Sequence, residues 1–97
     1  MDAQASVLLD TVAQELNIPQ DELLREGLRT FLERRLRAVR AEIFEIHGRY
    51  GIRSVEEMEA RYEQGSLEEG DSWRDLQRLD HLEYEQDRLQ QLLGLVR

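Results

Sequence analysis

The sequence predicts an all-α protein of four helices, and three observations support this fold class. Apolar residues recur at three- and four-residue spacing along most of the chain. No segment alternates apolar and polar residues as a half-buried strand would, and the chain has one proline and six glycines. We therefore expect a single helical domain over residues 1–97. Within it, residues 1–47 would form a helical hairpin and a long helix, and residues 48–97 a short helix, an acidic loop and a C-terminal helix.

The first two helices are predicted at residues 4–17 and 20–47. Pro19 separates them, because proline disfavours helical geometry in the residue before it and fits the first turn of a helix. From Leu32 onward, the apolar residues of the second helix recur at steps of 4, 3, 4 and 3. This spacing is typical of a helix that packs lengthwise against another helix.

The third and fourth helices are indicated by their predicted first residues. Ser54 and Glu57 form a capping-box pattern at the start of a short helix that ends before Gly65. An acidic loop follows over residues 65–71, and Ser72 is predicted to cap a fourth helix of about 22 residues that frays near Gly94. We expect the two long helices to pack antiparallel, as a hairpin or small bundle.

The composition excludes several classes of protein. The chain has no cysteine, so neither disulfides nor zinc–thiolate sites are expected. It has no run of about 18 apolar residues, and its first residues are acidic or neutral rather than basic, so we expect no membrane contact and a cytoplasmic location. A chain of this size buries only about 60–65% of its unfolded surface, and a second copy would complete such a thin core. We therefore expect a homodimer.

Charge is distributed unevenly along the chain, whose net charge is −8. Residues 1–40 hold seven acidic residues and six arginines, whereas residues 41–97 hold fourteen acidic residues and seven arginines. The two halves therefore carry charges of −1 and −7. An acidic protein without a single lysine is a poor candidate for binding free duplex DNA, so a nucleic-acid partner is not expected.

Residues 5–37 read ASVLLDTVAQELNIP and, after Gln20, DELLREGLRTFLERRLR. This stretch resembles the helix–turn–helix half of the ribbon-helix-helix (CopG-like) repressors and antitoxins. The resemblance implies two helices that intertwine in a dimer, and a C-terminal extension that wraps a cognate toxin in the antitoxins. The DNA-reading strand of that family is missing here, because only a few acidic or neutral residues precede the first helix.

These observations predict an antitoxin-like protein–protein interaction module that neutralises or scaffolds a partner, such as a basic toxin. Two alternatives remain open: a ribbon-helix-helix DNA-binding regulator with a degenerate ribbon, and a small metal-dependent nucleotide phosphohydrolase. The predicted dimer interface consists of Leu24, Leu28, Phe31, Leu32, Arg35, Leu36, Val39 and Glu42. The predicted partner-binding residues are Trp73, Leu76, Leu79, Leu82, Leu89 and Leu93.

Charged residues on these helices suggest further hypotheses. Arg35 and Glu42 fall within the apolar arc of the second helix, so they either form ion pairs with another helix or chain, or extend to water. His47 and His81 lack the spacing of a helical metal site, and His47 suits the last turn of a helix. An acidic cluster could bind Mg²⁺, but a solvated surface is the preferred interpretation. We predict no catalytic, cofactor-binding or metal-binding residue. The acidic cluster that we interpret as a solvated surface consists of Glu56, Glu57, Glu59, Glu63, Glu68, Glu69 and Asp71.

Overall fold

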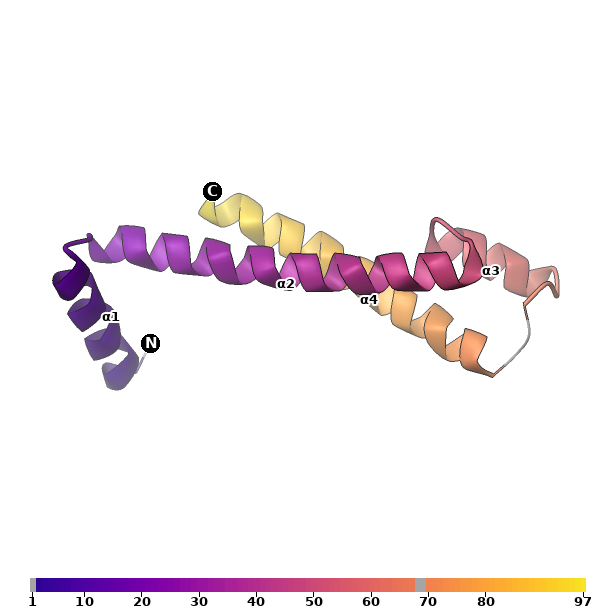
Figure 1. Ribbon diagram of the computed structural model, residues 1–97, viewed down its shortest axis with the longest axis horizontal. Coiled ribbons are helices and arrows are strands. Elements are labelled where there is room, and N and C mark those ends of the chain that lie inside the picture. Colours follow the sequence, from indigo (N-terminus) through magenta and orange to yellow (C-terminus); the bar gives the residue numbers. More distant parts are fainter. Residues whose placement is uncertain (1, 68–69) are drawn as a thin grey trace.

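A computed structural model describes residues 2–67 and 70–97, except for the side chain of Asp71. The described residues are helical with short connections and include no β-strand, which confirms the predicted all-α fold class. The helices are α1 (Ala3–Leu16), α2 (Gln20–Tyr50), α3 (Val55–Glu63) and α4 (Asp71–Val96), as shown in Figure 1.

The molecule is elongated because α2 runs along most of its length (Figure 1). Its extents are 60 × 23 × 17 Å and its radius of gyration is 19.4 Å. A compact domain of the same length would have a radius of gyration of about 12–13 Å. Helix α4 crosses α2 in the antiparallel direction, α3 lies at the C-terminal end of α2, and α1 folds back from the N-terminal end. The two ends of α2 therefore have different surroundings.

The hydrophobic core lies between α2 and α4 and is closed at one end by α3. The α2 residues that follow the predicted 4-3-4-3 spacing after Leu32 are all buried. Met58 and Leu79 have no exposed surface, and Leu82 is 1% exposed. The buried cluster consists of Leu36, Val39, Ile43, Ile46, Ile52, Val55, Met58, Leu76, Leu79, Leu82, Leu89 and Leu93.

Helix α2 is three residues longer than predicted. It passes through Gly48 and ends at Tyr50, and Gly51 takes the left-handed conformation with φ of 63° as the C-cap. Glycine adopts this conformation without steric cost, so Gly51 is a better helix terminus than Gly48. Helix α4 likewise continues through Gly94 to Val96.

The two predicted serine caps have different outcomes. Ser54 is confirmed as the cap of α3, since its Oγ accepts a hydrogen bond of 3.1 Å from the backbone N–H of Glu57. The prediction for Ser72 is wrong, because α4 begins at Asp71 with Gly70 at the cap position. Ser72 therefore lies within the first turn of α4, where it is buried.

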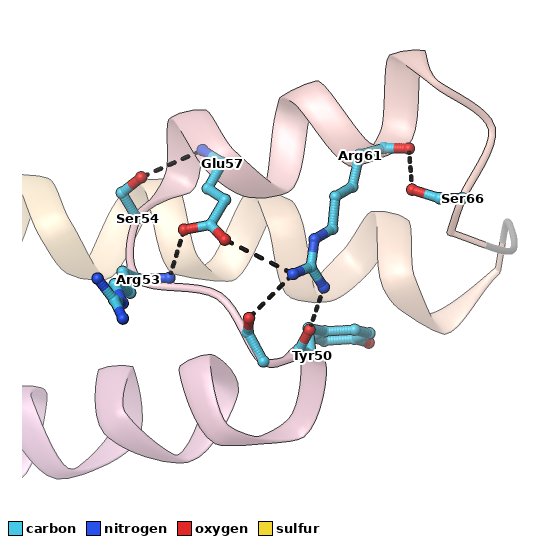
Figure 2. Close-up of polar contacts among 7 residues, drawn as sticks. Tyr50, Arg53, Ser54, Glu57, Arg61 and Ser66 are labelled. Atoms are coloured by element: carbon cyan, nitrogen blue, oxygen red, sulfur yellow. Dashed lines mark hydrogen bonds and ion pairs between the residues drawn. The ribbon is translucent and has the colours of Figure 1, made fainter.

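The turn between α2 and α3 is fixed by Arg61, as Figure 2 shows. Its guanidinium donates hydrogen bonds of 2.6 Å to the backbone oxygen of Tyr50 and 3.1 Å to that of Gly51. It also lies 3.6 Å from the Glu57 carboxylate, which accepts a 3.0 Å hydrogen bond from the backbone N–H of Arg53. One side chain therefore satisfies two carbonyls at the end of α2 and holds α3 against it.

A second polar cluster joins the end of α2 to the start of α4. The Asp75 carboxylate accepts hydrogen bonds of 2.6 Å from Arg49 and 2.5 Å from the Tyr50 hydroxyl. Burial alone would raise the pKa of Asp75, but the hydrogen bonds from Tyr50 and Arg49 and the charge of Arg49 outweigh it, so this pKa lies below its ordinary value. Burial, followed by the bond to Asp75, raises the pKa of Tyr50. The cluster is therefore strongest when Asp75 is ionised.

Candidate protein-binding surfaces

Large apolar side chains stay exposed on α1, on the N-terminal part of α2 and at the end of α4. Helix α4 ends beside the early turns of α2, and the Arg97 side chain lies 3.5 Å from Glu33. Leu95, which is 77% exposed, lines a hollow of about 210 Å³ together with Leu24 and Leu28. We call this region the apolar end. Its exposed residues are Val7, Leu8, Val12, Leu16, Leu24, Leu28, Phe31 and Leu95.

The exposed area of the whole chain is large for its mass. The accessible surface is 7389 Å², whereas a compact monomer of 11.5 kDa exposes about 5,800 Å². The difference is about 1,600 Å², and a standard protein–protein interface buries about 800 Å² on each partner. The surplus is therefore large enough to supply an interface.

The predicted dimer interface divides into two parts. Leu24, Leu28 and Phe31 belong to the apolar end, and Phe31 is 59% exposed. Leu32 packs against the core, while Leu36 and Val39 are buried between α2 and α4. Of these six apolar residues, only Leu24, Leu28 and Phe31 are accessible to a second chain in this fold.

Arg35 and Glu42, the two charged members of the predicted interface, pair with α4. The Nε atom of Arg35 lies 3.3 Å from a carboxylate oxygen of Glu85, and Glu42 accepts a hydrogen bond of 2.6 Å from Arg78. This confirms the hypothesis of ion pairs with another helix. The Arg35 side chain is 59% exposed and that of Glu42 is 42% exposed, so each pair contributes little to stability.

Five of the six predicted partner-binding residues lie in the core. Their apolar side chains cover α2, so a partner cannot reach them in this fold; they are Leu76, Leu79, Leu82, Leu89 and Leu93. The sixth, Trp73, is 48% exposed. Its ring packs against that of Tyr62, with 5.6 Å between the ring centroids and 55° between the ring planes. These rings line a hollow of about 230 Å³ together with Leu76, Glu59 and Glu63.

The residues considered for a metal site do not converge in the part of the chain that the structure describes. No group of three or more histidine, aspartate or glutamate side chains there is arranged to hold a metal ion. Glu68 and Glu69 of the acidic cluster lie outside the described residues, as does the side chain of Asp71. His47 lies in the last turn of α2, as predicted, and His81 is 3.9 Å from Glu85.

Sequence reasoning did not identify Arg61 or the cluster around Asp75 as important, because both depend on contacts between distant residues.

Within the described ranges, no helix is both long enough and apolar enough to cross a membrane. No curated protein matches the chain, and no solved structure matches it. A family model described as the Uncharacterized protein MJ0235 family matches residues 1–96. With almost its whole length matched, the chain belongs to the Uncharacterized protein MJ0235 family.

Proposed function

We propose that this protein is an antitoxin-like interaction module that dimerises through its apolar end and binds a partner protein, which it neutralises or scaffolds. The observation that carries the proposal is the set of large apolar side chains left exposed on α1 and the start of α2. Large apolar side chains exposed together in one region are typical of a protein-binding site.

A second copy of the chain is the occupant that best fits the apolar end. In a two-fold symmetric dimer, each copy contributes the same residues, so one apolar surface is enough to make a self-complementary interface. The whole chain exposes about 1,600 Å² more than a compact monomer of its mass, and a standard interface buries about 800 Å² on each partner. The resemblance of residues 5–37 to the dimerising helices of ribbon-helix-helix proteins supports the same arrangement.

The partner would bind on the acidic half of the chain, at the end of the molecule where α3 and the start of α4 lie. Residues 41–97 carry fourteen acidic residues against seven arginines. Opposite charge speeds the encounter of two proteins and disfavours partners of like charge. A basic protein, such as an RNA-cleaving toxin, therefore fits this half.

One observation favours DNA binding as a second candidate function. Five arginines of α2 are exposed, and none forms an ion pair within the described part of the chain: Arg25, Arg29, Arg34, Arg37 and Arg40. They could contact phosphates if the carboxylates around them were neutralised by a partner. A gel-shift assay with the DNA upstream of the protein's own gene, repeated at rising salt concentration, would test this candidate.

The dimer is tested by Phe31→Asp, which places a charge in the apolar end. We expect the wild-type chain to sediment as a dimer at micromolar concentration, and the variant as a monomer with unchanged helical circular dichroism. Phe44→Asp is the matched control, because Phe44 lies on the same helix, is 79% exposed and is outside the apolar end. The control should remain dimeric.

Two results would contradict the proposed dimer. A wild-type chain that stays monomeric at all concentrations would show that the apolar end does not self-associate. A folded Phe31→Asp variant that stays dimeric would place the interface elsewhere.

A further inference from the structure

We infer that the hollow between α3 and α4, lined by Trp73 and Tyr62, binds an arginine side chain from a basic segment of the partner. This inference rests on the proposed function, because it specifies the chemistry by which the acidic half would recognise that partner. It concerns α3 and α4, at the other end of the molecule from the apolar end.

The shape of the hollow suits one side chain. Its volume is about 230 Å³, which is below the range of about 300–1,000 Å³ found for small-molecule sites. The two aromatic rings stand at 55° to each other, so they offer two differently oriented surfaces to one occupant. Leu76, which is buried, lies at the core side of the hollow.

Charge favours a cation in this hollow. Glu59 and Glu63 line it from consecutive turns of α3, and both are exposed. Among the described residues, neither carboxylate takes part in an ion pair or a hydrogen bond. A cation placed between them could therefore form ion pairs with both carboxylates without breaking an existing contact.

The chain's own nearby arginines do not fill this site. Arg61 is on the same helix, but its guanidinium bonds to the backbone oxygens of Tyr50 and Gly51 (Figure 2). Arg74 lines an adjoining hollow that shares the Tyr62 and Trp73 rings, but it does not line the hollow that holds Glu59 and Glu63. The site is thus left for an arginine from another molecule.

Arginine fits these walls better than lysine does. A guanidinium is planar, stacks on an aromatic face and can bond to carboxylates through several N–H groups at once. A lysine ammonium is a strongly hydrated point charge and gains less from the rings. An anionic ligand would be repelled by Glu59 and Glu63.

The experiment uses the emission of Trp73, which is the chain's only tryptophan. The full chain is titrated with a glycine–serine peptide that carries two arginines, and with matched peptides carrying two lysines or two citrullines. We expect a saturable change in emission with the arginine peptide, a weaker response with lysine and none with neutral citrulline. The indole N–H signal of Trp73 in a ¹H–¹⁵N spectrum gives a second readout.

Two variants test the carboxylates. Glu59→Gln combined with Glu63→Gln should weaken binding of the arginine peptide by at least about threefold, since two exposed charge pairs are lost. Glu56→Gln is the matched control, because Glu56 is exposed on the same helix but does not line the hollow. The control should bind as the wild type does.

The inference is overturned if neither the emission nor the indole signal responds to the arginine peptide, or if citrulline gives the same response. Equal weakening by the control variant would also overturn it. Phe31→Asp lies outside the hollow and should keep the peptide response. Failure of the dimer and failure of the arginine site are therefore measured separately.

Discussion

The packing of α4 on α2 predicts how much folding stability is lost when a buried leucine is replaced with alanine. Leu79 has no exposed surface and Leu82 is 1% exposed, and both belong to the core cluster. Replacing either with alanine removes the stabilisation from three buried carbon atoms and leaves a space that the neighbouring side chains fill only in part.

The structure distinguishes the two sites. Leu82 also lines an open groove between α2 and α4, beside Arg35 and Glu42, so the space left by its side chain can open to solvent. Leu79 has no exposed surface and lines none of the hollows described above, so we expect the space left by its side chain to stay closed. Within the range of about 2–5 kcal/mol for such changes, we expect about 2–3 kcal/mol for Leu82→Ala and about 3–4 kcal/mol for Leu79→Ala.

Urea unfolding followed by circular dichroism at one fixed protein concentration measures these losses, because the stability of a dimer depends on concentration. Tyr84→Ala is the control: Tyr84 is on the same helix, is 69% exposed and should change stability by less than about 0.5 kcal/mol. If Leu79→Ala costs no more than the control, the reasoning that places α4 against α2 is refuted.

Two smaller predictions concern polar contacts. Since the pKa of Asp75 is lowered on folding, its carboxylate stabilises the fold above its ordinary pKa, and this contribution is lost as the pH falls through the folded value. Asp75→Asn should therefore lose less stability than the wild type on acidification from about pH 5 to pH 2, and parallel unfolding curves would contradict this. A double-mutant cycle on Glu42 and Arg78 should give about 0.2–1 kcal/mol of coupling that falls with salt, whereas coupling above about 2 kcal/mol would contradict an exposed pair.

The helices were predictable because apolar spacing and turn residues are local signals. The 4-3-4-3 steps after Leu32 identify the face of α2 that α4 covers, and Ser54 with Glu57 marks the start of α3. The end of α2 was predicted too early because glycine is common at helix ends and Gly48 comes before Gly51. Contacts made by Arg49 and Tyr50 with Asp75 favour the longer helix, and Asp75 lies 26 and 25 positions away from them in the sequence.

The candidate surfaces were harder to predict for a related reason. An apolar stripe such as the one through Leu79 shows that a helix face is covered, but periodicity does not tell whether α2 or another molecule covers it. Five leucines assigned to a partner therefore belong to the chain's own core. Phe31 remains exposed because it lies outside the face of α2 that α4 covers, and Trp73 remains half exposed although its ring packs against Tyr62.

The length of α2 also determines the valency of the proposed assembly. A 31-residue helix spans about 46 Å, and it separates the apolar end from the hollow near Trp73. Two chains joined end to end through their apolar ends would carry their arginine sites at the far ends, too distant for one short segment to bridge. Such a dimer would hold two partner molecules apart, or gain avidity only for a partner that is itself dimeric or long.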